Sequence, residues 1–342
     1  MDVNRRMLIA RLPEGALRAD DFGLDTAAVP EVGEGEVLVR TLAFTIGAGQ
    51  RAGLQGSAGY AGAPVAGRVM EGAGVGQVVH SRSGAVAEGD LVRGPLGWQE
   101  YACMRAELLE SVASGASAAS ADPAIHLGPL GINGITAYFG LLDVGRPRAG
   151  ETVLVSAAAG SVGHLVGQIA ALQGARVVGV AGSDAKCSLL TDELGFAAAV
   201  NHRSATFRDE LKAATPDRID VYFDNVGGAV LGSALFRMNL HGRIVCCGAV
   251  SAYDTSNPDP SPRGIPGLLV NNRVRMEGFL VFDYEDRYGE ARAQMSEWIS
   301  TGRLTPRSTV FEGLQSAGHA FVELLAGNTV GTTIVRVAGS VP

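Results

Sequence analysis

The stretch of sequence that decides the fold reads VLVSAAAGSVG and covers residues 153–163. An apolar, strand-like run is followed there by a tight turn of small residues, and a helix-like segment begins at Ser161. Ala158, Gly160 and Gly163 match the dinucleotide-binding pattern G-x-G-x-x-G, with alanine in its first position. Gly160 would let a pyrophosphate approach the backbone, and Gly163 would let helix and strand pack closely. We therefore expect a dinucleotide site at Ala158, Gly160, Ser161, Val162 and Gly163, rather than a purely structural turn.

The chain around this turn alternates between strand-like and helix-like segments. The strand-like runs cover residues 152–156, 176–180, 197–200, 219–223, 243–248 and 276–282. Because these runs are apolar throughout, they fit a parallel sheet that is covered on both faces. This pattern predicts an α/β fold with a doubly wound parallel sheet of the Rossmann type.

The first part of the chain has a different pattern. Its short apolar segments, interrupted by glycine, cover residues 36–40, 65–70, 90–93 and 98–104. Such spacing predicts an irregular, β-rich antiparallel domain. A linker rich in small residues is expected at 111–122, and the strand-like run 332–337 is expected to rejoin the first domain. We therefore predict a β-rich domain of residues 1–127 and 308–342 and a Rossmann domain of residues 128–307.

The composition excludes several classes of protein. The chain has 342 residues, of which 46% are hydrophobic and 18% charged, too apolar for a disordered protein. A formal net charge of -7 argues against a general nucleic-acid surface. The N-terminus lacks the features of a signal peptide, and the uncharged stretches 123–142 and 152–175 are interrupted by glycine and polar residues. We expect a cytoplasmic protein with no membrane or nucleic-acid partner.

Metal ligands are scattered along the sequence. The six histidines form no H-x-x-x-H pair, and the four cysteines form no CxxC pair. Catalytic zinc needs about three such ligands converging on one point. We therefore expect no metal site and no disulfide framework, and we interpret His164 and His319 as helix residues without a chemical role.

The segment VVGVAGSDAK (177–186) bears on the choice between NAD and NADP. An enzyme that prefers NAD carries a carboxylate at the end of its second strand, whereas Gly182 and Ser183 are in that region here. Lys186 could meet a 2′-phosphate as a point charge, or it could be a solvated helix residue. Asp184 could be a displaced acidic residue or the cap of the next helix. The segment favours NADPH/NADP+.

Three further segments are candidate site material: GINGITAYFGL (131–141), CGAVSAYD (247–254) and GFLVF (278–282), the last interpreted as a strand. The second follows a strand at the carboxyl edge of the sheet, where ligands bind in this architecture. Within it, Tyr253 could hold a substrate oxygen beside a nicotinamide, and ordinary packing is the alternative.

Taken together, these motifs resemble the zinc-independent medium-chain dehydrogenases/reductases of the alkenal/one oxidoreductase branch. That branch includes the prostaglandin reductases, plant double-bond reductases and bacterial curcumin reductases. The resemblance covers most of the chain, and its motifs are GWQEYA (97–102), ITAYFGL (135–141), ETVLVSAAAGSVG (151–163), VVGVAGSDAK (177–186), YFDNVGG (222–228), GRIVCCGAVSAYD (242–254) and MEGFLVF (276–282).

The resemblance implies a chaperonin-10-like (GroES-like) first domain and an NADPH-dependent enzyme. It implies that Lys186 and His202 hold the 2′-phosphate, with histidine where relatives usually have tyrosine. It places Tyr253 where relatives have a loop tyrosine that binds the substrate carbonyl and the nicotinamide ribose. The other implied cofactor-binding residues are Thr136, Asn225, Cys247, Gly248, Ala249, Ser251, Phe279, Leu280, Val281 and Asn328.

The sequence departs from the family in its first domain. Where relatives carry an Asp-Pro-Tyr-Met-Arg segment, this chain reads Gly47-Ala48-Gly49-Gln50-Arg51 and keeps only the arginine. Gln50 and Arg51 are the implied substrate contacts at this segment. Thr332 also replaces a lysine that is frequent in relatives. Cofactor motifs that are kept beside a changed substrate segment predict a changed substrate with unchanged hydride chemistry.

These observations predict an NADPH-dependent reductase that delivers hydride to the β-carbon of an α,β-unsaturated carbonyl compound, with Tyr253 as the catalytic residue. Alternatives are a quinone reductase, a carbonyl or alcohol oxidoreductase on the same scaffold, or a non-catalytic NADPH-binding protein. By analogy with the family we expect a homodimer, with pairing around 276–282 across a two-fold axis.

Overall fold

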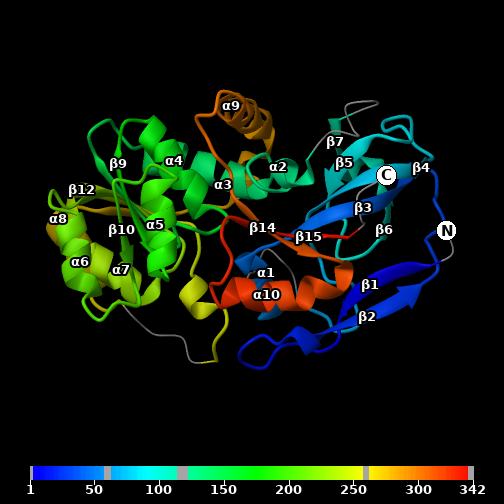
Figure 1. The fold of residues 1–342 in the computed structure, drawn as a ribbon, viewed down its shortest axis with the longest axis horizontal. Coiled ribbons are helices and arrows are strands. Elements are labelled where there is room, and N and C mark those ends of the chain that lie inside the picture. The colour runs from blue at the N-terminus through cyan, green and yellow to red at the C-terminus, as the bar shows by residue number, and fades with distance from the viewer. Residues whose placement is uncertain (1–2, 58–62, 114–121, 257–261, 338–342) are drawn as a thin grey trace. The chain divides into compact units, whose positions relative to one another are not determined.

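The structure is a computed structural model that describes residues 3–57, 63–113, 122–256 and 262–337. The chain divides into two compact units (Figure 1). One consists of Met1–Gly128 and Ser308–Pro342, and the other of Pro129–Arg307. The Rossmann-like unit is continuous in sequence, whereas the β-rich unit is built from both ends of the chain.

The central unit contains a six-stranded parallel sheet in the order β10-β9-β8-β11-β12-β13. Its strands are β8 (Thr152–Val155), β9 (Arg176–Ala181), β10 (Ala198–Asn201), β11 (Ile219–Asp224), β12 (Met238–Cys246) and β13 (Arg275–Gly278). The strand order reverses at β8, because the chain moves outward in one direction through β9 and β10 and in the other through β11 and β12. This arrangement is the predicted doubly wound sheet.

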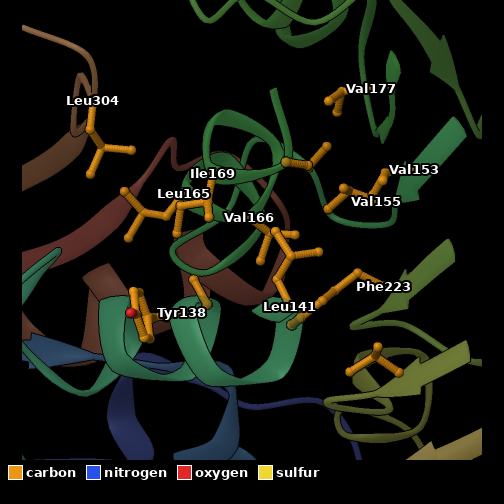
Figure 2. Close-up of a cluster of buried hydrophobic side chains, with 14 of the residues drawn as sticks. Tyr138, Leu141, Val153, Val155, Leu165, Val166, Ile169, Val177, Phe223 and Leu304 are labelled. Atoms are coloured by element: carbon orange, nitrogen blue, oxygen red, sulfur yellow. The ribbon is translucent and has the colours of Figure 1, made fainter. Parts of the chain in front are cut away.

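The helices of this unit cover both faces of the sheet. They are α3 (Ile132–Phe139), α4 (Gly163–Leu172), α5 (Asp184–Asp192), α6 (Phe207–Ala214), α7 (Gly228–Leu235), α8 (Ile265–Asn272) and α9 (Tyr288–Ser300). Alternate residues of β8 belong to hydrophobic cores on opposite faces of the sheet. Val153 and Val155 pack with α3, α4 and α9. Leu154 packs with α6 and α7 on the other face. Figure 2 shows how Leu165, Val166 and Ile169 of α4 gather with the β8 valines. Burying each such side chain contributes roughly 1.5–3 kcal/mol.

The β-rich unit contains a seven-stranded sheet in its described residues, in the order β14-β15-β3-β4-β5-β7, with β6 also paired to β3. Its strands are β3 (Glu36–Ile46), β4 (Gly74–Ser81), β5 (Leu91–Gly94), β6 (Tyr101–Arg105), β7 (Glu110–Ala113), β14 (Ser308–Glu312) and β15 (Thr332–Arg336). A separate antiparallel pair joins β1 (Asn4–Ile9) and β2 (Phe22–Ala27). As predicted, the C-terminal strand-like run rejoins this unit, because β15 pairs with β3 (Figure 1).

The helices of the β-rich unit are short: α1 (Ala48–Leu54), α2 (Pro123–Leu127) and α10 (Ala317–Leu325). The Asp122 side chain caps α2 by accepting a hydrogen bond from Ala124 N at 3.0 Å. An aromatic core joins α10 to the two sheets of this unit. Trp98 packs against Phe22 of β2, Phe44 of β3 and Phe321 of α10. No helix in the described ranges combines the length and the apolar character needed to cross a membrane.

The predicted fold class is confirmed, and three local predictions are wrong. The run 65–70 forms no strand beyond a single bridge between Leu8 and Val69. Residues 111–113 belong to strand β7, and the rest of the expected linker, up to 121, lies outside the described residues. The strand predicted at 276–282 covers Arg275–Gly278, and Val281 already begins a 3₁₀ segment that runs to Arg287.

Candidate cofactor and substrate site

The predicted site residues lie near the carboxyl ends of the parallel strands, around the point where the strand order reverses between β8 and β11. The chain leaves β8 and β11 toward opposite sides of the sheet. In sheets with this topology, ligands bind in the crevice at the carboxyl ends of these strands. Most of the predicted residues follow those ends directly. Residues 156–163 follow β8, 182–186 follow β9, 202–203 follow β10, 225–228 follow β11, 247–253 follow β12 and 279–281 follow β13.

The turn after β8 has the close packing that its glycines predict. Ala157 adopts a left-handed φ of 47°, and its carbonyl accepts a hydrogen bond from Gly160 N at 2.9 Å. A Cβ at Gly163 would lie 2.3 Å from Ala157 O, so only glycine allows α4 to begin this close to the turn. A Cβ at Gly160 would meet Ala157 O at 3.1 Å and no other described atom within 4 Å outside its own chain neighbours. The backbone at Gly160 is therefore open to a phosphate group.

The beginning of α4 is tied to the end of this unit by His164. The imidazole is fully buried, its Nδ1 lies 2.8 Å from Gly160 O, and its Nε2 accepts a hydrogen bond from Arg307 N at 3.1 Å. This geometry requires a neutral ring that donates from Nδ1. Burial lowers the pKa of His164 to about 4, so the ring is neutral at pH 7. His164 thus has a structural role that the sequence did not indicate.

The ends of β9 and β10 form a corner with several cationic or titratable side chains. A Cβ built on Gly182 would lie 3.3 Å from His202 Nε2 and 3.7 Å from Arg203 Nε. Lys186 lies in the first turn of α5, and the pKa of its ammonium group is lowered by burial and, to a smaller extent, by the charge of Arg203. We name Gly182, Lys186, His202 and Arg203 the basic corner. Arg203 was missed by the sequence analysis.

The contacts of Asp184 exclude one of its two alternatives, the helix cap. Ser183, not Asp184, caps α5, because the Ser183 hydroxyl accepts a hydrogen bond from Lys186 N at 3.3 Å. Asp184 Oδ1 accepts a hydrogen bond from Asn201 Nδ2 at 2.8 Å. The carboxylate is therefore engaged beside the basic corner in a contact with the end of β10.

A buried carboxylate joins the segment after β8 to β11 and the segment that follows it. Asp224 is 2% exposed, and its Oδ1 accepts hydrogen bonds from the hydroxyls of Tyr222 and Ser156 and from Val226 N and Gly227 N, at 2.7–3.1 Å. Burial and the neighbouring carboxylate raise the pKa of Tyr222 well above its usual value, so this phenol stays a donor. We call Ser156, Tyr222 and Asp224 the carboxylate hub.

Asn225 is held rigidly beside the hub. Its backbone N donates to Ser156 Oγ at 2.9 Å, and its side-chain amide donates to Ser156 O at 2.7 Å. The Asn225 carbonyl accepts a hydrogen bond from Val250 N at 3.2 Å, which ties the segment after β12 to the segment after β11. The predicted cofactor residue is thus part of one hydrogen-bonded framework with the loop that follows β12.

That loop carries the predicted catalytic tyrosine. A 3₁₀ turn at Val250–Ala252 folds Tyr253 back, so that its hydroxyl accepts a hydrogen bond from Ala249 N at 3.0 Å. A Cβ at Gly248 would lie 3.4 Å from the same hydroxyl oxygen. The Ser251 hydroxyl donates to Val226 O at 2.6 Å, a second tie to the segment after β11. Tyr253 is partly exposed, and its hydroxyl lies beside Gly248 and Ala249.

The residues after β13 reach back to α3. The Phe279 ring fits against Gly140, where a Cβ would lie 2.4 Å from Phe279 Cζ. Leu280 is exposed, and the Val281 carbonyl accepts a hydrogen bond from the Tyr288 hydroxyl at 3.2 Å. Thr136, one turn before Gly140, donates its hydroxyl to Ile132 O at 2.7 Å. The structure thus brings the segments of Phe279 and Thr136 together.

Three predicted residues lie in the β-rich unit. The Gln50 amide is engaged at both ends, since Oε1 accepts from Gly47 N at 2.8 Å and Nε2 donates to Glu71 O at 2.6 Å. Arg51 is 1% exposed and donates to Gly15 O at 2.5 Å. The side chain is thus enclosed and held by the Gly15 carbonyl, and the contact of Arg51 with a substrate stays a prediction. Asn328 donates to Glu323 Oε2 at 3.0 Å on the surface.

The cysteines and possible metal ligands do not form a reactive centre in the described residues. All four cysteines are free, and burial raises the pKa of Cys246 to about 11 and of Cys247 to about 12. These thiols therefore stay protonated at neutral pH. Within the described ranges, no three or more His, Cys, Asp or Glu residues are grouped so that they could hold a metal ion.

Comparison with known proteins places the chain among oxidoreductases. Residues 5–112 match a family described as the N-terminal domain of oxidoreductase, and residues 161–300 match a family described as zinc-binding dehydrogenase. The NADPH-dependent curcumin reductase of Escherichia coli strain K12 is 38% identical over 340 residues, which cover 98% of this chain and 97% of that protein. Prostaglandin reductase 1 of Bos taurus is 38% identical over 322 residues, 92% of this chain and 94% of that protein.

A solved structure agrees with these relatives. The crystal structure of CurA from Vibrio vulnificus in complex with NADPH has a TM-score of 0.92 and 36% identity, and the match covers 98% of this chain and 99% of CurA. The chain therefore belongs to the medium-chain dehydrogenase/reductase family, in the alkenal/one oxidoreductase branch of the curcumin and prostaglandin reductases. The predicted family is confirmed.

Proposed function

We propose that the protein is an NADPH-dependent reductase of the carbon–carbon double bond in α,β-unsaturated carbonyl compounds. The observation that carries this proposal is the framework at the carboxyl edge of the sheet, where an open phosphate turn, a basic corner and the Tyr253 loop are joined by hydrogen bonds. The named relatives confirm the predicted class, an NADP-dependent oxidoreductase.

The residues present fit NADPH at two points. The backbone at Gly160 is open where a pyrophosphate would approach, and the α4 N-terminus offers N–H donors there. In this fold the adenosine ribose of a dinucleotide lies at the end of the second strand. At that place the basic corner offers the Lys186 ammonium, the Arg203 guanidinium and the His202 imidazole. A dianionic 2′-phosphate is the group that such a donor set favours. We assign the phosphates to residues 158–163 and the 2′-phosphate to Lys186 and His202.

When bound, NADPH supplies the hydride from its nicotinamide ring. The task of the chain is then to stabilise the negative charge that develops on the substrate oxygen. The Tyr253 hydroxyl already accepts a hydrogen bond from Ala249 N, so its own hydrogen is the one left to donate to that oxygen. Accepting the backbone hydrogen bond also polarises the hydroxyl and makes it a stronger donor. We assign Tyr253 the role of oxyanion donor.

The substrate class is tested by a panel of compounds and the loss of NADPH absorbance. We expect turnover with 2-alkenals and enones, no turnover with the matching saturated aldehydes and ketones, and much weaker activity with NADH. Product analysis should show that the double bond is reduced and the carbonyl is retained. Faster oxidation with quinones, or reduction of the carbonyl, would assign one of the alternative oxidoreductase activities. NADPH binding without turnover of any compound would assign a non-catalytic role.

We also propose that the reaction needs no metal ion, although one matching family is described as zinc-binding. The support is the lack of a ligand cluster in the described part of the chain and the raised pKa values of Cys246 and Cys247. Elemental analysis should find no stoichiometric zinc, and chelators should leave turnover unchanged. About one zinc per chain together with loss of activity on chelation would contradict this proposal.

We further propose a homodimer that pairs through β13. Among the described residues this strand is at the edge of the six-stranded sheet, so one of its sides has no neighbouring strand, and Leu280 and Phe282 after it are exposed. Light scattering should give twice the chain mass, and Met276→Pro should lower it toward that of one chain. A monomeric native protein would contradict the assignment. A cytoplasmic location stays a prediction from the sequence.

A further inference from the structure

His202 of the basic corner titrates near neutral pH, and its side chain lies, like that of Arg203, against the backbone of Gly182. His202 N donates to Ala181 O at 2.9 Å, which continues the pairing of β9 and β10 by one step. The imidazole Nε2 and the Arg203 guanidinium both lie within 4 Å of the Cβ position at Gly182. The two side chains thus approach the end of β9 from the end of β10, at the place assigned above to the 2′-phosphate.

The charged groups around this imidazole are predominantly cationic. Arg203 follows it in the chain, and Lys186 comes from the first turn of α5. The nearby carboxylates have other partners, since Asp184 accepts from Asn201 and Glu210 of α6 accepts from the Ser204 and Thr206 hydroxyls. Burial and, to a smaller extent, the charge of Arg203 lower the pKa of His202 below its usual value. The imidazole is therefore mostly neutral at pH 7 before a ligand binds.

We propose that His202 takes up a proton when the 2′-phosphate of NADPH binds, so that the preference for NADPH over NADH increases as the pH falls from about 8 to about 6. This inference rests on the proposed function, because it concerns the same cofactor site. Histidine in place of the usual tyrosine thereby makes the choice of cofactor depend on pH.

The direction follows from linkage. A dianion beside the imidazole favours the charged ring and raises its pKa in the complex above the lowered pKa of the free protein. Between these two pKa values each bound 2′-phosphate brings a proton with it, so NADPH affinity can rise by up to about tenfold per pH unit as the pH falls. NADH has no such phosphate, and its affinity should change little. Below about pH 6 the phosphate itself gains a proton, which limits the useful window.

The experiment is calorimetric titration with NADP+ and NAD+ in buffers of different ionisation enthalpy, at pH 7 and without phosphate. The matched variant is His202→Gln, which keeps a polar side chain but cannot gain a proton. NADP+ should bind with proton uptake that is larger in the native protein than in the variant, and NAD+ should show no such difference. A phosphate that releases a proton on binding does so in both proteins, so the difference isolates the imidazole.

A second measurement follows the ratio of the NAD+ and NADP+ dissociation constants from pH 8 to pH 6. The ratio should rise several-fold in the native protein and stay nearly flat in His202→Gln and in His202→Tyr. NMR titration of the His202 ring should give a higher pKa with NADP+ than without it. Equal proton uptake in native protein and variant, or a pH-independent ratio in the native protein, would overturn the inference while leaving NADPH as the cofactor. Equal affinity for NADP+ and NAD+ at every pH would overturn the proposed cofactor itself.

Discussion

The phenolic oxygen of Tyr253 accepts a hydrogen bond from the backbone nitrogen of Ala249, four residues earlier, at 3.0 Å. The bond closes the loop after β12 on itself and fixes the direction of the hydroxyl. A second tie from Ser251 to Val226 holds the same loop to the segment after β11. The tyrosine is therefore oriented by its own loop before any substrate binds.

Tyr253→Phe keeps the ring and removes the hydroxyl. If that hydroxyl donates to the developing oxyanion, turnover should fall by about 10²–10³, or roughly 2.7–4 kcal/mol in activation free energy. The affinity for NADPH, measured by fluorescence titration, should change much less. The Ala249 N–H also loses its partner, so thermal unfolding is measured alongside. Near-native turnover would assign Tyr253 to packing or to orientation of the cofactor.

Asp224→Ala removes the acceptor of the carboxylate hub. The buried hydroxyls of Tyr222 and Ser156 and two partly buried backbone N–H groups then lose this acceptor, and each buried group left unsatisfied costs about 1–3 kcal/mol. Urea unfolding should therefore show a loss of several kcal/mol. Tyr222→Phe is the matched control, because it removes only one donor and should cost about 0.5–1.5 kcal/mol. Equal losses in the two variants would contradict the central role of the carboxylate.

The positions of the parallel strands along the chain and the turn at 153–163 could be predicted because they depend on local patterns. A uniformly apolar run indicates a strand that is buried on both faces. Gly163 indicates close packing against Ala157, which is only six residues away. The last strand was predicted too long because the run after Gly278 remains apolar, but Phe279 turns inward to fit against Gly140. That contact joins positions far apart in sequence, which no local pattern reports.

The parts of the site that were missed depend on tertiary contacts. Arg203 approaches Gly182 only because β9 and β10 are neighbours, and the Asp224 carboxylate accepts from Ser156 only because β8 and β11 are neighbours. His164 has the sequence pattern of an ordinary helix residue, and its role requires the return of the chain at Arg307. Arg51 matched a family motif, yet the fold encloses its side chain. Residue identity alone does not distinguish an exposed arginine from an enclosed one.

Lys186→Ala tests the assigned contact with the 2′-phosphate. A hydrogen bond to a charged group contributes roughly 1.5–3 kcal/mol, so the preference for NADPH over NADH should fall about tenfold or more. Raising the ionic strength should mimic part of this loss, because a partly exposed charge pair is screened by salt. Lys212→Ala is the control, since the only other lysine is exposed on α6. Unchanged affinities in Lys186→Ala would make this lysine a solvated helix residue, and a parallel loss for both cofactors would indicate a damaged helix.

His164 should make the folded protein sensitive to mild acid. Its pKa is about 4 when folded, whereas an unfolded histidine titrates near 6.5, so the unfolded state binds the proton first as the pH falls. Stability should therefore decrease from about pH 6.5 down to about pH 4, by roughly 3 kcal/mol in total, and this contribution should level off below pH 4. His164→Gln is neutral at every pH and lacks this term. Urea unfolding of both proteins between pH 7 and pH 4.5 should give curves that converge as the pH falls, since the carboxylates contribute equally to each. Parallel curves would show that the pKa of His164 is the same in the folded and unfolded states. The assignment of a neutral ring that bridges Gly160 O and Arg307 N would then be wrong.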